Sequence, residues 1–226
     1  MKRSLTPEIL DHLPPDDPGA IASRKDLVRI NRLLGHRRFM AQALRALPEQ
    51  PRSILELGAG EGTLLLQTLQ RTDLLRDGGQ LTFLDLVDLI HDSTHQAYAQ
   101  LGWSSHSVTG DVFQEMPSAD LILANLFLHH FEPKPLRALL SAVQERCSAF
   151  IAIETARNPF AVAGAKLLGL IGCHRVTRHD AVVSAQAGFS GRELSSLWLW
   201  ENSAGWTCQE GAVSPFTHRF VAVRSS

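Results

Sequence analysis

The sequence predicts an α/β fold in which a mostly parallel β-sheet carries helices on both faces. Two observations support this prediction. Five short apolar segments after residue 52 alternate with helical segments, and such alternation produces right-handed crossovers and parallel strands. These segments are apolar almost throughout, as expected of strands that are covered on both faces. The 226 residues suit one domain, so we treat residues 1–226 as a single unit.

The N-terminal quarter of the sequence predicts an arm followed by a helix. Residues 1–23 contain four prolines and a run of acids, a composition that favours an extended arm. Residues 24–47 repeat apolar side chains at helical spacing, which predicts a leading helix with a bend at Gly35. The basic residues that follow this glycine, His36 to Arg38, are interpreted as a solvated helix end rather than as a ligand contact.

The central part of the sequence, residues 48–155, contains the alternating elements. The expected strands span residues 53–57, 80–85, 106–109, 119–125 and 149–154. The expected helices between them span residues 62–71, 93–101 and 135–146. These elements predict the ligand-binding core of the domain.

The C-terminal part departs from this alternation. Residues 156–190 predict a helical insertion after the fifth strand, whose apolar side chains from Leu167 to Ile171 suit either a lid over a ligand or a homodimer face. Residues 191–226 predict a helix over 191–200 and a terminal hairpin of segments 205–213 and 216–223.

The composition excludes several classes of function. Lys and Arg number 22 against 23 for Asp and Glu, so there is no global positive field to hold nucleic acid. No stretch is long and apolar enough to cross a bilayer, and the N-terminus lacks the apolar core of a secretory signal. We therefore expect a cytoplasmic protein with no membrane partner. The three widely spaced cysteines fit neither a disulfide framework nor a metal site.

The most informative segment is residues 54–62, ILELGAGEG, in which an apolar strand runs into glycines and then a helix. Ligands of open α/β sheets bind at this end of the strands, and glycines let a ligand lie on the backbone. The G-x-G-x-G spacing differs from the G-x-G-x-x-G of dinucleotide-binding proteins. Glu56 would repel a pyrophosphate but attract an ammonium or sulfonium group. The segment therefore favours a cationic cofactor.

Acids also end the next two strands. Asp85 follows the second strand, where a carboxylate meets ribose hydroxyls; Asp88 is an alternative for this role. Asp111 and Val112 follow the third strand, where they suit an adenine amino group. An ordinary turn remains an equal explanation of Asp111.

These motifs resemble those of the class I S-adenosylmethionine-dependent methyltransferases, which have a Rossmann-like, doubly wound fold, over roughly residues 24–154. The resemblance implies S-adenosylmethionine as the cofactor and a small-molecule acceptor. It also implies a C-terminal antiparallel strand. Carried over residue by residue, it implies that the cofactor is bound by Glu56, Gly58, Ala59, Gly60, Asp85, Leu86, Asp111, Val112 and Asn125.

The end of the fourth strand narrows the acceptor class. Its sequence Ala124-Asn125-Leu126-Phe127 departs from the Asn/Asp-Pro-Pro-Tyr motif of family members that methylate bases and amides, which argues against DNA, RNA and glutamine amides. Asn125 is interpreted either as a contact of the methionine end of the cofactor or as a partner of backbone groups.

Two adjacent histidines are the candidate catalytic residues. His129 and His130 follow the fourth strand and so lie beside the expected methyl group, and imidazole has the pKa that suits a general base at neutral pH. We expect their side chains to point in different directions, so that at most one faces the reaction. Hydrogen bonding to the loop backbone is the alternative. A third histidine, His179, is followed by Asp180, which either orients it or forms a surface ion pair.

The sequence thus predicts methyl transfer to a small, hydrophobic or aromatic metabolite, with O-methylation favoured over C-methylation, as in the methyltransferases of bacterial secondary metabolism that it resembles. Two alternatives stay open. One is a catalytically silent protein that binds the cofactor as a scaffold or sensor, and the other is a nicotinamide-dependent oxidoreductase.

Overall fold

The computed structural model describes residues 1–72, 78–199 and 205–225, and it confirms the predicted fold. Seven strands form one sheet in the order β3-β2-β1-β4-β5-β7-β6. Strands β1 to β5 pair in parallel, whereas β7 pairs antiparallel with both β5 and β6. The strands are β1 (Ser53–Leu57), β2 (Gly79–Asp85), β3 (Trp103–Thr109), β4 (Leu121–Asn125), β5 (Ala149–Thr155), β6 (Trp206–Ala212) and β7 (Thr217–Arg224).

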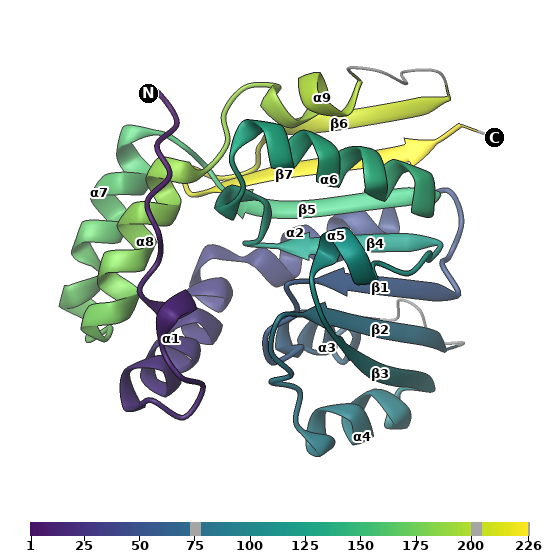
Figure 1. Cartoon of the computed structure of the whole chain (residues 1–226), viewed down its shortest axis with the longest axis horizontal. Coiled ribbons are helices and arrows are strands. Elements are labelled where there is room, and N and C mark those ends of the chain that lie inside the picture. Colours follow the sequence, from purple (N-terminus) through teal and green to yellow (C-terminus); the bar gives the residue numbers. More distant parts are fainter. Residues whose placement is uncertain (73–77, 200–204, 226) are drawn as a thin grey trace.

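Helices cover both faces of the sheet (Figure 1). On one face lie α2 (His36–Arg45) and α3 (Thr63–Leu69), with α4 (Asp92–Gln100) against the edge strand β3. On the other face lie α5 (Val112–Glu115), α6 (Pro133–Arg146) and α9 (Glu193–Trp198). Each face has its own buried apolar cluster, because alternate side chains of a strand point to opposite faces. Trp200, at the end of the predicted last helix, lies outside the described residues.

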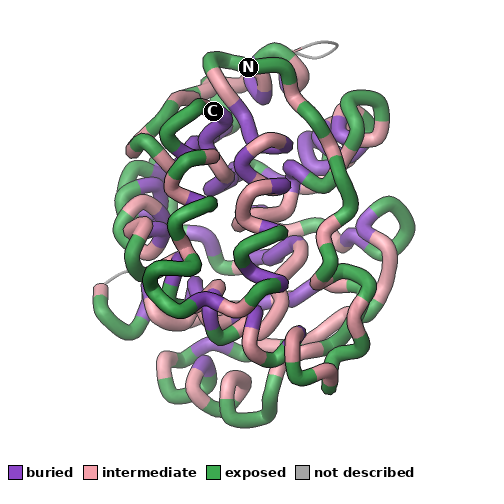
Figure 2. Tube along the Cα trace, turned by 90° about the vertical axis from the view of Figure 1, so that its left-hand side faces the viewer, coloured by how far each residue is buried: buried purple, intermediate pink, exposed green. Residues whose placement is uncertain are grey.

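A third group of elements covers the edge of the sheet at which the parallel strands end. It consists of α1 (Pro18–Leu34), α7 (Pro159–Leu167), α8 (Arg175–Ala187) and the 3₁₀ turns η1 (Leu10–His12), η2 (Leu128–His130) and η3 (Leu168–Ile171). Figure 1 shows α1, α7 and α8 beyond the arrowheads of the parallel strands. Figure 2, viewed from this side, shows exposed positions on the outer turns and buried ones inside. The predicted insertion therefore lies over the ligand-binding edge.

The N-terminal elements differ in their bounds from the prediction. The arm ends at Asp17 rather than at residue 23, because the Asp17 carboxylate accepts hydrogen bonds from the first amides of α1 and Pro18 occupies the first helical position. The predicted single helix is two helices separated by Gly35, whose φ of 76° is left-handed.

No helix among the described residues is long and apolar enough to span a membrane. Cys147, Cys173 and Cys208 are free thiols.

Candidate active site

The glycine loop between β1 and α3 has the geometry of a ligand cradle. Gly58 and Gly60 both have left-handed backbones, with φ of 61° and 53°. A Cβ on Gly58 would lie 2.3 Å from the Phe127 ring, whereas a Cβ on Gly60 would meet nothing within 4 Å. The amide of Gly60 donates a hydrogen bond of 2.9 Å to the Asp85 carboxylate. Asp85 thus holds the loop, and the backbone leaves room for a ligand over Gly60 but not over Gly58, which is covered by Phe127.

Glu56 lies on β1, just before this loop, and is almost fully buried. Ile54 and Leu123 belong to the core cluster on the α2 and α3 face, so strand alternation directs Glu56 and Asn125 toward that same face. Burial, and to a lesser extent the charge of Asp85, raises the pKa of Glu56 to about 8. Oε2 of Glu56 has no hydrogen-bond partner. An unpaired buried carboxylate oxygen fits a cationic ligand, since such a group would satisfy it.

The acids that follow β2 and β3 take different roles. Asp88 accepts a hydrogen bond from the Ile90 amide and so stabilises an exposed turn. Leu86 is 72% exposed at the surface beside Asp85. Asp111 caps α5, since its Oδ1 accepts a 2.9 Å hydrogen bond from the amide of Phe113, and Val112 begins that helix. The turn interpretation of Asp111 therefore holds, although its other carboxylate oxygen takes no part in the cap.

Asn125 contacts a residue that the sequence placed in solvent. Nδ1 of His36 donates a hydrogen bond of 3.2 Å to Oδ1 of Asn125, and His36 is completely buried. Burial lowers the pKa of His36 to about 4, so the ring is neutral. The interpretation as a solvated helix end was wrong for His36, because α2 packs on the sheet and the turn at Gly35 directs its first side chain inward.

A buried carboxylate positions the segment that contains His129. Glu154, near the end of β5, accepts hydrogen bonds of 2.9 and 2.7 Å on Oε1 from the amides of Phe127 and Leu128. Its Oε2 accepts a 2.8 Å hydrogen bond from Nδ1 of His129. The backbone enters this segment through Leu126, which has a left-handed φ of 53°. Glu154 therefore fixes both the loop and the orientation of the imidazole.

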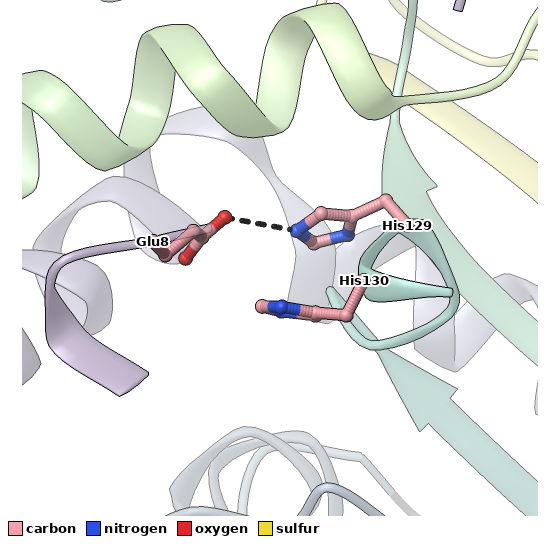
Figure 3. Close-up of side chains that lie close together, drawn as sticks. All are labelled: Glu8, His129 and His130. Atoms are coloured by element: carbon pink, nitrogen blue, oxygen red, sulfur yellow. Dashed lines mark hydrogen bonds and ion pairs between the residues drawn. The ribbon is translucent and has the colours of Figure 1, made fainter. Parts of the chain in front are cut away.

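The other nitrogen of His129 faces the N-terminal arm. Nε2 lies 3.3 Å from Oε1 of Glu8 (Figure 3). Burial alone would lower the pKa of His129, but the hydrogen bonds and charges of Glu154 and Glu8 outweigh it and raise this pKa to about 10. His129 is thus an imidazolium held between two carboxylates.

His130 lies alongside His129 rather than pointing elsewhere. The two ring centroids are 4.4 Å apart with an interplanar angle of 32°, and Nδ1 of His130 is 3.2 Å from Oδ2 of Asp11. Our expectation of divergent side chains was wrong, because the chain forms a 3₁₀ turn here instead of a strand or regular helix. Both imidazoles face the arm.

The ligand atoms of Glu8, His129 and His130 lie within 4.8 Å of one another, a spacing that a metal ion could bridge. Metal ligands must direct their lone pairs toward one point. Here Nε2 of His129 and Nδ1 of His130 face different carboxylates, Glu8 and Asp11 respectively. The cluster is therefore arranged for hydrogen bonds, and we assign no metal to it.

Several residues of this site were missed by sequence reasoning. Glu154 could have been identified from the sequence as a site residue, because it is an acid at the end of an apolar strand, as Asp85 is. Glu8 could not, since nothing in the sequence of the arm shows where the arm docks. Three aromatic rings also form a wall from α5 to η2, with centroids 5.8 Å apart for Phe113 and Phe131 and 5.1 Å apart for Phe127 and Phe131.

The predicted His179 and Asp180 pair forms, with Nδ1 of His179 2.9 Å from Oδ1 of Asp180. The His179 side chain is nearly half exposed, whereas Asp180 is buried. Asp180 also accepts hydrogen bonds from the amides of Ile9 and Leu10. It therefore anchors the arm in addition to pairing with His179.

Comparisons with known proteins agree with this geometry. Residues 26–155 match the O-methyltransferase domain family. No curated protein matches the chain significantly. The plantazolicin methyltransferase BamL, in complex with a triazolic desmethylPZN analog and SAH, has a similar structure, with a TM-score of 0.66 and 12% identity over 96% of this chain and 93% of that one.

Two further solved structures are longer than this chain. A putative O-methyltransferase from Nostoc punctiforme has a TM-score of 0.58 and 16% identity over 84% of this chain and 56% of its own. The pyocyanin biosynthetic protein PhzM has a TM-score of 0.54 and 20% identity over 82% of this chain and 54% of its own. The chain spans about half the length of these two proteins, and at such identities the likeness concerns the fold.

Proposed function

Because the chain belongs to the O-methyltransferase domain family and is a methyltransferase that uses S-adenosylmethionine, we propose that its acceptor is the hydroxyl group of a small, hydrophobic or aromatic metabolite. The observation that carries this proposal is the buried hydrogen-bonded pair of His129, in the turn after β4, and Glu154, near the end of β5. Family membership sets aside the nicotinamide-dependent oxidoreductase.

The cofactor would supply an electrophilic methyl group, and the residues of the glycine loop would bind it. In this proposal Glu56 attracts the positively charged methionine part, Gly58, Ala59 and Gly60 line it with backbone, and Asn125 hydrogen-bonds its end. Asp85 accepts from the ribose hydroxyls, with Leu86 beside it, and Asp111 and Val112 bind the adenine. The unpaired Oε2 of Glu56 and the open space over Gly60 support this assignment.

We propose His129 as the general base. Glu154 holds Nδ1–H of the ring, which leaves Nε2 as the nitrogen that can take a proton from an acceptor hydroxyl. A base so oriented removes the proton as the oxygen attacks the methyl group. The aromatic wall of Phe113, Phe127 and Phe131 would pack against a flat acceptor. His130 is the alternative base, since it is the more exposed of the two rings.

A larger acceptor is the second candidate. The plantazolicin methyltransferase matches this chain over almost the whole length of both proteins, whereas the two O-methyltransferase-like structures are matched over about half of theirs. That full-length match favours an acceptor of the size and type of a plantazolicin precursor.

The decisive test is a panel of phenols, carbon acids, amines and azole-containing peptides with S-adenosylmethionine that is labelled in the methyl group. Transfer to a phenol would support the main proposal, and transfer to an azole-containing peptide the second. His129→Gln should retain affinity for S-adenosylhomocysteine but lose at least about tenfold in rate, with partial recovery at high pH as the acceptor ionises unaided.

The control is His106→Gln, which changes an exposed histidine on the edge strand β3 and should leave the rate unchanged. If His129→Gln methylates as fast as the unmodified protein and His130→Gln does not, the base is His130.

A further inference from the structure

The N-terminal arm, residues 1–17, is bound across the site instead of extending into solvent. The guanidinium of Arg3 donates hydrogen bonds to the carbonyls of His129 and Phe131 at 3.1 and 2.9 Å. Farther along, the amides of Ile9 and Leu10 donate to Asp180 of α8 at 2.8 and 2.9 Å. These contacts lie on both sides of Glu8, so they determine where its carboxylate sits.

Glu8 uses that position to contact η2 and α8. Its Oε1 lies 3.3 Å from Nε2 of His129 and also accepts a hydrogen bond from the hydroxyl of Ser184. The Glu8 side chain is 12% exposed and that of His129 is 3% exposed. In Figure 3 the carboxylate of Glu8 projects from the arm toward His129, with His130 beside them. No other described side chain hydrogen-bonds to this nitrogen of His129.

This contact conflicts with the entry of an acceptor. Nδ1 of His129 is bound to Glu154, so an acceptor hydroxyl can reach only Nε2, where Glu8 already lies. Next to this anchor the arm is less closely packed, because Ile9 and Leu13 line an open pocket of about 550 Å³ together with Val176 at the start of α8. Close packing resists movement, so the arm has more freedom here than a core element.

We propose that Glu8 is a residue of the acceptor site: the arm holds its carboxylate on Nε2 of His129 until an acceptor hydroxyl takes that place. The proposal rests on the proposed role of His129 as the base. It makes the arm a strap that covers the acceptor site and must release Glu8 before methyl transfer.

The exchange also accounts for the proton. With Glu8 in place, Nε2 carries a proton that it shares with Oε1 of Glu8. When Glu8 leaves, the N–H bond breaks and the proton passes to water. The lone pair of Nε2 would then accept the hydroxyl proton of the acceptor while an electron pair of the acceptor oxygen forms the new bond to the methyl carbon. The bond between that carbon and the cofactor sulfur would break in the same step, and its electron pair would leave on the sulfur.

The titratable and charged groups around His129 come from four elements. Glu8 and Arg3 belong to the arm, Glu154 to β5, His130 to η2 and Asp180 to α8 beneath the arm. Among the residues that the structure describes, only Glu8 and Glu154 hydrogen-bond to the imidazole. Glu154 lies on β5, an interior strand of the sheet, whereas Glu8 lies on the N-terminal arm.

The first experiment follows the imidazole itself and needs no acceptor. Histidine ring nitrogens labelled with ¹⁵N are titrated by NMR in the full-length protein saturated with S-adenosylhomocysteine, and His129→Gln assigns the signal. Glu8→Gln should move the titration of His129 down by at least about one pH unit, since one of its two carboxylates is lost. Asp16→Asn, which removes a charge from an exposed position of the same arm, should leave it unchanged.

The second experiment adds phenol as the acceptor probe. Phenol should move the His129 titration in the unmodified protein toward that of Glu8→Gln and have little further effect in Glu8→Gln. With an acceptor from the panel, Glu8→Gln should be several-fold faster than the unmodified protein below pH 8, and Asp16→Asn should not.

The proposal is overturned if Glu8→Gln leaves the His129 titration in place, or if phenol shifts it equally with and without Glu8. Failure of the base assignment would look different. In that case His129→Gln would methylate normally, while Glu8→Gln would still shift the titration.

Discussion

Asp85 is the residue whose contacts make it the better candidate for the ribose, because its carboxylate already holds the amide of Gly60. Asp88, the alternative that the sequence left open, bonds to the amide of Ile90 in an exposed turn. Two acids three residues apart are equivalent in sequence. They become distinct only when the strand end and the glycine loop are placed together.

Replacing Asp85 by Ala should weaken binding of S-adenosylhomocysteine by about 2 to 3 kcal/mol, since charge-assisted hydrogen bonds contribute roughly 1.5 to 3 kcal/mol. Isothermal titration calorimetry measures the loss directly. The matched variant Asp88→Ala should bind as tightly as the unmodified protein. The reverse pattern, in a folded Asp85→Ala protein, would move the ribose contact to Asp88.

Glu56 should make cofactor binding depend on pH. Its pKa of about 8 means that most protein molecules carry a neutral carboxyl group at pH 7 before the cofactor binds, whereas the cationic cofactor binds better to the carboxylate. Affinity for S-adenosylmethionine should therefore rise by up to about tenfold per pH unit below pH 8. Measurements between pH 6 and 7.5 keep the α-amino group of the cofactor mostly charged.

The control for this dependence is Glu56→Gln, which has no titrating group at that position. It should bind the cofactor more weakly and with an affinity that changes little over the same range. An equally steep dependence in Glu56→Gln would assign the proton to another group.

At the scale of elements, the sequence predicted most of the sheet and the helices α3, α4 and α6 on its faces, but not how the N-terminal arm docks. Apolar strands and the glycine loop are local patterns, so β1, β2, β4 and β5 were predicted within two residues of their bounds. The docking of the arm on η2 and α8 depends on contacts between residues more than 120 positions apart. No local pattern encodes such contacts, and Glu8 was missed for that reason.

The loop after β1 offers a matched pair of glycines. Gly58→Ala would both require a left-handed backbone and press a Cβ to 2.3 Å from the Phe127 ring, whereas Gly60→Ala meets only the backbone strain. Strain of this kind costs roughly 1 kcal/mol, and a core clash adds about 1 to 3 kcal/mol. Chemical denaturation should thus show Gly58→Ala to be less stable than Gly60→Ala.

Cofactor binding should rank the two variants in the opposite order: Gly60→Ala, the more stable variant, should lose more affinity than Gly58→Ala. The methyl group of Gly60→Ala would occupy the open space over the loop, so this variant should lose affinity for S-adenosylhomocysteine while remaining folded. Equal stability of the two variants would mean that Phe127 moves aside without cost.

At the scale of the whole molecule, the site places several ionisable groups in the interior. His129 is an imidazolium between two carboxylates, and its raised pKa shows that the folded state prefers its charged form. Glu56 is held in its neutral form by burial. The carboxyls of Glu8, Glu154 and Glu210 have lowered pKa values because histidines hydrogen-bond to them, against the effect of burial. Such groups link folding to pH.

The signs of these shifts predict a stability maximum in weakly acidic solution for the cofactor-free protein. Glu8, Glu154 and Glu210 stabilise the fold above their ordinary pKa of 4.5 and lose this contribution as the pH falls. Glu56 contributes below pH 4.5 and loses its contribution as the pH rises to about 8. His129 contributes fully below pH 6.5 and loses its contribution as the pH rises to about 10. Urea denaturation at pH 5, 6.5, 8 and 10 should therefore show stability falling steadily above pH 6.5.

Two variants separate the groups that produce this decline. Glu56→Gln has no carboxyl group that can ionise, so between pH 5 and 8 its stability should fall less than that of the unmodified protein. Between pH 8 and 10 only His129 of these two groups still titrates, so the stability of both proteins should fall equally steeply there. Glu8→Gln lowers the pKa of His129 and should move that second decline to lower pH. A flat profile from pH 6.5 to 10 in the unmodified protein would mean that neither group is held as the structure places it, because a buried imidazolium or a neutral buried carboxyl must make stability depend on pH.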